Sequence, residues 1–188
     1  NLFATGRFSD LAVEAAPTEE GAVVTLVFSA AATVAEVAIS GRGIPAKGRV
    51  IDAIGTRPRD TWSEDRGVAS ARAALRVLEE RGLFEAEVTP RVEPGPDDTS
   101  VNVTFLVVPG RPAVPAPAAF TGDLGPLAAD ELRREGKLRR QRVFREAVAR
   151  EDAERYAARY KELGRSRAEV RYEGVTYDRG TGQATPRY

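Results

Sequence analysis

The strongest constraint on the fold of this 188-residue chain is an internal repeat with a period of roughly 80 residues. Short phrases recur in the same order: Ile39-Ser40-Gly41 as Phe120-Thr121-Gly122, Gly55 as Gly136, Ala86-Glu87-Val88 as Ala168-Glu169-Val170, and Gly6-Arg7-Phe8 as Gly82-Leu83-Phe84. A repeat of this size is a supersecondary unit that stacks on its neighbours. We therefore expect the end of a first copy in residues 1–31, a complete copy in 32–110, and a further copy in 111–188 that lacks most of its last strand.

The complete copy has the pattern β-α-α-β-β. A strand-like run at 34–41 precedes two helical patterns, the second ending at Gly82, and strand-like runs follow at 84–94 and 101–108. The second helix carries a capping-box pattern at Thr61 to Glu64 and an apolar face of Val68, Ala71, Leu75 and Leu78 at helical spacing. The predicted fold class is α+β, in which each unit is a three-stranded sheet covered on one face by two helices.

Prolines predict the order of the strands. Pro90 lies inside the run 84–94, and a proline cannot donate to a ladder, so we expect an edge strand there. The run 101–108 has no proline and is mostly apolar or β-branched, so it should be central. Pro115 and Pro117 give the opening strand of the third copy the same edge signature.

The flanking copies repeat parts of this pattern. Residues Leu2 to Gly6 are typical of a helix end, and the runs at 11–17 and 23–28 predict a hairpin. In the third copy, a second helix is predicted from residues at helical spacing, and alternation of Val170 and Tyr172 with charged residues predicts a strand across 168–178. The helical positions are Ala149, Ala153, Tyr156, Tyr160 and Leu163.

Composition excludes several classes of function. The chain has 28 basic and 28 acidic residues, so it carries no net positive charge that would attract nucleic acid. It has no cysteine and no histidine, so disulfides, thiolate chemistry and the commonest metal ligand are absent. No apolar run approaches the ~20 residues that span a bilayer. We expect no catalytic residue, no cofactor and no metal; a pair of carboxylates would be the only route to acid-base chemistry.

Other polar groups have ordinary interpretations. Arg139, Arg140, Arg142 and Arg145 could meet phosphate or an acidic partner, but nearby Glu131, Glu135, Glu146 and Glu151 favour a solvated helix face. Asp97-Asp98 belongs to a turn and offers too few ligands for a metal. Trp62 and the tyrosines of the third copy favour core packing over ligand contact. The loop Gly41 to Gly43 lacks the lysine-serine ending of a phosphate loop.

The chain resembles tandem polypeptide-transport-associated (POTRA) repeats. Three features carry the resemblance: the helix-end-to-strand phrase around Phe8, Phe84 and Ser166, the apolar-x-Gly ending of the opening strand at Gly41 and Gly122, and the glycine between the helices at Gly55 and Gly136. The third copy departs from the pattern, because Ser166 stands where an aromatic residue is usual and its opening strand is rich in proline.

The resemblance implies a binding scaffold without catalysis in the periplasm, within the arm of a BamA/TamA-type outer-membrane assembly or translocation protein. The partners it implies are unfolded outer-membrane protein clients, accessory periplasmic or lipoprotein partners, neighbouring POTRA repeats and a C-terminal β-barrel. The alternatives are the POTRA arm of an exported hydrolase or of a two-partner secretion transporter. A periplasmic cell-division scaffold is disfavoured, because that family usually carries one such repeat.

The strand that follows the second helix is the candidate binding site. Its unpaired edge could accept an incoming strand through main-chain hydrogen bonds, as POTRA domains are thought to do. The candidate residues are Glu85, Ala86, Glu87, Val88, Thr89 and Arg91, with equivalents at Ser9 to Ala15 and Arg167 to Tyr172. The competing interpretation has equal weight: Pro90 and the charges of Glu85, Glu87 and Arg91 only protect the edge against aggregation.

Overall fold

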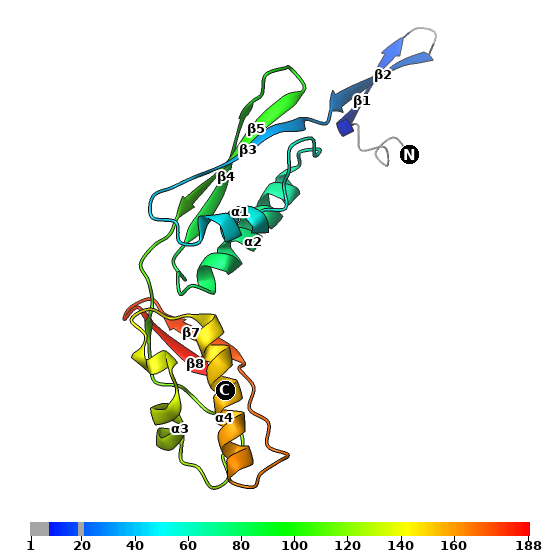
Figure 1. Ribbon diagram of the computed structural model, residues 1–188. Coiled ribbons are helices and arrows are strands. Elements are labelled where there is room, and N and C mark those ends of the chain that lie inside the picture. Colours follow the sequence, from blue (N-terminus) through cyan, green and yellow to red (C-terminus); the bar gives the residue numbers. More distant parts are fainter. Residues whose placement is uncertain (1–7, 19–20) are drawn as a thin grey trace. The chain divides into compact units, whose positions relative to one another are not determined.

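The computed structural model describes residues 8–18 and 21–188 (Figure 1). The helix end expected at Leu2 to Gly6 lies outside these residues. The chain divides into two compact units, one of residues 1–42, 47–74 and 88–107, the other of 43–46, 75–87 and 108–188. The second unit therefore includes the end of a helix and a turn that precede the predicted third copy.

The sheet of the complete copy has the predicted topology. Strands β3 (Thr33–Ser40), β5 (Ser100–Val108) and β4 (Glu87–Pro94) lie in the order β3-β5-β4, with β3 parallel to β5. Helices α1 (Lys47–Ala53) and α2 (Glu64–Glu79) follow β3 in the chain and cover one face of the sheet (Figure 1). The β-α-α-β-β order is confirmed, with β5 central and the proline-containing β4 at the edge.

Two predicted details of α2 were wrong. The helix begins at Glu64 and its cap is Ser63, whose Oγ accepts a hydrogen bond from the Arg66 N–H at 3.2 Å; Thr61 instead bridges to β3. Val68 is 38% exposed, because the buried face runs one position earlier along the helix. That face consists of Gly67, Ser70, Ala71, Ala74 and Leu78.

The last part of the chain forms a second α+β arrangement. Strands β6 (Val114–Pro115), β8 (Gln183–Arg187) and β7 (Gly174–Asp178) lie in the order β6-β8-β7, with β6 parallel and β7 antiparallel to β8. The helices are α3 (Ala129–Glu135), the short 3-10 helix η2 (Leu138–Arg140) and α4 (Glu146–Glu162).

One expectation about these strands was wrong. The strand expected across 168–178 begins only at Gly174. Residues Ala168, Val170 and Tyr172 are half-buried against the core without joining the ladder, so their alternation reflects burial alone. The last strand of this arrangement is the five-residue central strand β8, which is shorter than the nine residues of β5. That the third copy lacks part of its last strand stays a prediction.

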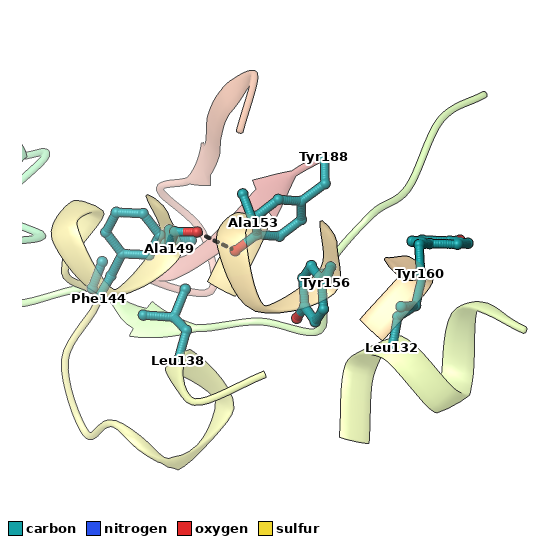
Figure 2. Close-up of a cluster of buried hydrophobic side chains, with 11 residues drawn as sticks. Leu132, Leu138, Phe144, Ala149, Ala153, Tyr156, Tyr160 and Tyr188 are labelled. Atoms are coloured by element: carbon teal, nitrogen blue, oxygen red, sulfur yellow. Dashed lines mark hydrogen bonds between the residues drawn. The ribbon is translucent and has the colours of Figure 1, made fainter. Parts of the chain in front are cut away.

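An aromatic cluster holds the second unit together. The ring of Tyr188 meets Tyr156 edge-on at 5.2 Å between centroids and stacks on Phe120 at 5.6 Å. The Tyr188 hydroxyl donates a hydrogen bond to the Ala149 carbonyl at 3.1 Å (Figure 2). Its backbone N–H bonds to Ala119 O at 2.9 Å. The last residue of the chain is therefore a core residue.

Strands β1 (Phe8–Thr18) and β2 (Gly21–Ala30) pair antiparallel, with Val13 opposite Leu26. Both of these side chains are more than half exposed. Across the described ranges 8–18 and 21–188, no helix combines the length and the apolar character needed to cross a membrane.

Candidate functional site

The two edges of the β3-β5-β4 sheet differ in how far the chain itself covers them. On the outer side of β3, the Val34 N–H bonds to Asp60 O at 2.8 Å, and the Arg59 N–H bonds to Val34 O at 2.7 Å. The Trp62 N–H bonds to Ala32 O at 2.8 Å. The first half of β3 is therefore already paired with the segment 59–62.

The other edge, β4, is open. Within the part of the chain that the structure describes, β4 has one neighbouring strand, β5. The Gly95 N–H bonds to Ser100 O at 2.9 Å, which fixes the direction of backbone groups at that end of the hairpin. Because the backbone N–H and C=O groups alternate in direction along a strand, those of Val88, Pro90, Val92 and Pro94 point outward. The open edge thus presents only two N–H donors, at Val88 and Val92, since the two prolines have none.

The side chains of β4 keep one face polar. Val88 is 8% exposed and packs inward, whereas Glu87, Thr89 and Arg91 are exposed. Arg91 Nε lies 3.1 Å from Glu93 Oε1 in an ion pair on that exposed face. An incoming strand would therefore pair with β4 through backbone hydrogen bonds. Its side chains would lie beside apolar residues on one face of the sheet and beside charged residues on the other.

Two of the candidate residues are not part of this edge. Strand β4 begins at Glu87, and Glu85 and Ala86 lie in the turn before it. The Glu85 carboxylate accepts hydrogen bonds from the Tyr177 hydroxyl at 2.8 Å and from Arg111 Nε at 3.1 Å. The Tyr177 hydrogen bond, followed by Arg111, holds the pKa of Glu85 below its ordinary value. Glu85 thus anchors the turn within the second unit and is not free to meet a partner strand.

The second unit has an open edge that the sequence prediction misplaced. The expected segment, Arg167 to Tyr172, is outside any strand, and the edge strand is β7. Because the Ala184 carbonyl accepts from Ala116 on the β6 side, alternation turns the backbone groups of Val175 and Tyr177 outward from β7. Residues 167–172 and 174–178 both lack proline, so the proline pattern does not distinguish the two segments.

The remaining polar candidates have structural roles. Asp97 Oδ1 accepts hydrogen bonds from the Thr99 N–H and from the Thr99 hydroxyl, both at 3.0 Å. The hydrogen bond with Ser100, and then those with Thr99, lower the pKa of Asp97. Among residues 8–18 and 21–188, no group of acidic side chains could hold a metal ion. The turn interpretation of Asp97-Asp98 therefore accounts for the contacts of this aspartate.

The basic cluster is less well neutralised than the sequence suggested. Glu135 pairs with Arg159 at 3.2 Å and Glu146 with Arg150 at 2.5 Å. Glu131 accepts from the Ala128 N–H at 3.0 Å. These three carboxylates are thus engaged away from Arg139 and its neighbours.

Comparison with known proteins assigns the complete copy to a family. Residues 32–110 match the model of the POTRA family, described as surface antigen variable number repeat. The β-α-α-β-β topology of the same residues agrees with that match. The chain therefore contains a POTRA domain at 32–110. No curated protein matches the chain in sequence.

Solved structures with similar folds include three of named origin. The POTRA3-5 fragment of Haemophilus influenzae BamA is 17% identical, with a TM-score of 0.46 and coverage of 96% of this chain and 70% of the other. POTRA1-2 of Omp85 from Anabaena is 21% identical, with a TM-score of 0.49 and coverage of 84% and 94%. CdiB from Escherichia coli is 13% identical, with a TM-score of 0.40 and coverage of 84% and 26%. The assignment rests on the family match and not on these scores.

Proposed function

We propose that this chain is part of a periplasmic module for outer-membrane protein assembly or secretion, and that it binds extended polypeptide segments by strand addition at β4. The proposed contacts are the backbone groups of residues 87–92. The observation that carries the proposal is the difference between the two edges: the chain pairs the first half of β3 with its own segment 59–62, while β4 has a neighbour on one side only among the described residues. The POTRA match of the same residues supports the module's class.

The proposed partners are unfolded outer-membrane protein clients and accessory periplasmic or lipoprotein partners. Neighbouring POTRA repeats and a C-terminal β-barrel would complete the protein. The balance of 28 basic and 28 acidic residues gives no field that would attract nucleic acid. We propose a binding role without catalysis.

Strand addition suits a receptor of many clients. Main-chain hydrogen bonds supply the attraction, and the sequence of the incoming strand matters little. Each such bond contributes a net ~1 kcal/mol, and β4 offers only two outward donors at Val88 and Val92. We therefore expect weak binding, with a Kd between about a micromolar and a millimolar. Weak contacts let clients be released.

The protective interpretation of Pro90 makes a different prediction. If the proline and the charges of β4 only prevent aggregation, the outward N–H groups of Val88 and Val92 should gain no partner when a peptide is added. The two interpretations can be separated by substituting one outward donor.

The experiment is an NMR titration of the labelled chain with a peptide of alternating apolar residues. We expect amide shifts along residues 87–92 that exceed those along Val101–Val108. Val92→Pro removes an outward N–H at an edge position where proline fits the ladder, and should weaken the peptide affinity about fivefold to tenfold. Val92→Thr keeps both the amide and the branched side chain, and should bind as the unaltered chain does.

Equal affinity of the Val92→Pro and Val92→Thr variants, with both folded, would contradict strand addition at β4. Peptide shifts confined to Gly174–Asp178 would move the site to β7 and would equally overturn the proposal for β4.

A further inference from the structure

The second unit contains a cavity of about 490 Å³ that the proposed function does not use. It is open to solvent on one side and is lined by the segment 115–118 and by residues of α3, η2 and α4. Its apolar lining comes from Ala116, Ala118, Leu138, Pro186 and Tyr188. The volume falls in the range of small-ligand sites, which are mostly apolar with a few polar groups.

The wall formed by residues 115–118 is unsuited to strand addition. The N–H groups of Val114 and Ala116 bond inward to Gly182 O at 2.9 Å and Ala184 O at 2.8 Å. The alternate positions are Pro115 and Pro117, which have no N–H. Arg133 Nε donates to Ala118 O at 2.8 Å and so occupies a carbonyl on this side. An added strand would therefore find no free N–H donor along 115–117.

The acidic groups at the cavity are already neutralised. Asp130 Oδ1 pairs with Arg133 at 2.7 Å. The carboxylate of Asp152, which is 1% exposed, accepts hydrogen bonds from the Lys137 N–H at 2.7 Å and the Leu138 N–H at 2.9 Å, and its Oδ1 lies 3.6 Å from Arg155 Nε in an ion pair. Neither carboxylate is therefore free to bind a cationic ligand.

Two arginines at the cavity have no such partner. Arg134 and Arg139 line it, are exposed, and pair with no carboxylate in residues 8–18 and 21–188. Arg139 Nε donates to Arg134 O at 3.0 Å, which holds the two residues together. Counted from the matching glycines Gly55 and Gly136, the POTRA domain at 32–110 has Ala53 and Pro58 at these positions. The charge pair is thus specific to the second unit.

A hydroxyl group adds a neutral donor. Tyr156 lines the cavity and is 2% exposed. Burial raises the pKa of Tyr156, so its hydroxyl stays protonated at neutral pH and can donate a hydrogen bond.

We infer that this cavity binds a small single-chain anionic amphiphile, with its apolar body against Ala116, Leu138 and Tyr188 and its carboxylate or phosphate at Arg134 and Arg139. An arginine pair suits such a head group because each guanidinium can donate two parallel hydrogen bonds. The inference is independent of strand addition, since it uses neither β4 nor β7.

The test is an NMR titration of the whole chain with three probes: decyl phosphate below its micelle concentration, decyl maltoside and inorganic phosphate. We expect decyl phosphate to shift the signals of Ala116, Leu138 and Tyr188, and to bind at least tenfold more tightly than either of the other two. Equal shifts from decyl maltoside would show a merely apolar contact and would overturn the role of the arginines.

Two variants and a control sharpen this test. Arg134→Gln with Arg139→Gln should weaken decyl phosphate binding about tenfold or more. Arg165→Gln with Arg167→Gln removes the same charge from residues outside the cavity and should leave the affinity unchanged. Ala116→Leu fills the cavity and should abolish binding while the near-ultraviolet circular dichroism stays native.

A lipid surface is the other source of the same chemistry. The control is binding of the chain to vesicles of anionic phospholipid. If the vesicles bind the chain equally with and without the Arg134 and Arg139 substitutions, and monomeric decyl phosphate does not bind, the cavity is not the site.

Discussion

At the residue scale, the two repeats use a buried polar side chain from the second helix for the same purpose. In the first, the Thr56 N–H donates to Ser70 Oγ at 3.1 Å. In the second, the Lys137 N–H donates to Asp152 Oδ1 at 2.7 Å, and Asp152 follows Ser70 by the repeat period. Both side chains are buried and satisfy the backbone just after the glycine between the helices. The repeat thus preserves a hydrogen-bonding role while the residue type changes.

Asp152→Ala should destabilise the second unit by about 2–4 kcal/mol, because two backbone N–H groups lose their acceptor. The five tyrosines all lie in this unit and Trp62, the single tryptophan, in the other, so each unit has its own optical signal. In a urea titration, the near-ultraviolet circular dichroism of the tyrosines should lose its native signal at a lower urea concentration in the Asp152→Ala variant than in the unaltered chain. Asp130→Ala, which breaks an exposed pair, should cost less than about 1 kcal/mol. Equal effects of the two substitutions would contradict the capping role.

Glu85 makes a pH-dependent contribution to the turn before β4. Its folded-state pKa lies below the ordinary 4.5, so its stabilisation is complete above pH 4.5 and is lost as the pH falls through the folded-state pKa. Tyr177→Phe removes the largest cause of the shift, and the pKa of Glu85 should rise toward 4.5 in a carboxyl NMR titration. Tyr172→Phe is the control, because the Tyr172 hydroxyl has no partner in the described part of the chain. An unchanged Glu85 pKa in Tyr177→Phe would contradict the assignment.

At the scale of the elements, the sequence pattern located the strands of the complete copy because proline and apolar alternation report directly on a ladder. Pro90 placed β4 at the edge, and the proline-free run of β5 placed it in the centre. The beginning of β4 could not be predicted, because Glu85 is held by Arg111 and Tyr177, which lie 26 and 92 residues further along the chain. The sequence around Glu85 does not predict contacts with residues so far along the chain.

The same limit applies to the candidate sites. The sequence predicts the alternation of β4, but the Gly95–Ser100 hydrogen bond of the structure is needed to show that the N–H groups of Val88 and Val92 point outward. The pairing of β3 with segment 59–62, which makes β4 the open edge, depends on a loop without a local signature. The strand predicted at 168–172 was wrong because half-burial against a core produces the same period of two as a ladder.

The junction between the helices differs between the repeats in how much space it leaves. A Cβ on Gly136 would collide with Tyr156 Oη, whereas a Cβ on Gly55 would meet Ser70 Oγ at an ordinary 3.7 Å. Gly136→Ala should therefore cost about 1–3 kcal/mol, and Gly55→Ala less than about 1 kcal/mol. Thermal unfolding followed by the tyrosine and tryptophan signals separates the two. A larger loss for Gly55→Ala would contradict this packing.

At the scale of the whole molecule, the two described α+β arrangements share one asymmetry. In each, the strand after the long helix, β4 or β7, is an edge strand without a second neighbour in the described residues. In each, backbone or side-chain groups of the chain occupy part of the other edge, at β3 through segment 59–62 and beside β6 through Arg133. A tandem of such units would present one open strand edge per unit, as the proposed strand addition requires.

Paramagnetic broadening from a spin-labelled peptide tests strand addition most directly. With the label at one end of an alternating apolar peptide, we predict broadening of amides in residues 87–92 that moves along β4 when the label is moved to the other end. Broadening centred on Thr33–Ser40, or no broadening in any strand at millimolar peptide, would contradict the proposal that β4 is the acceptor edge.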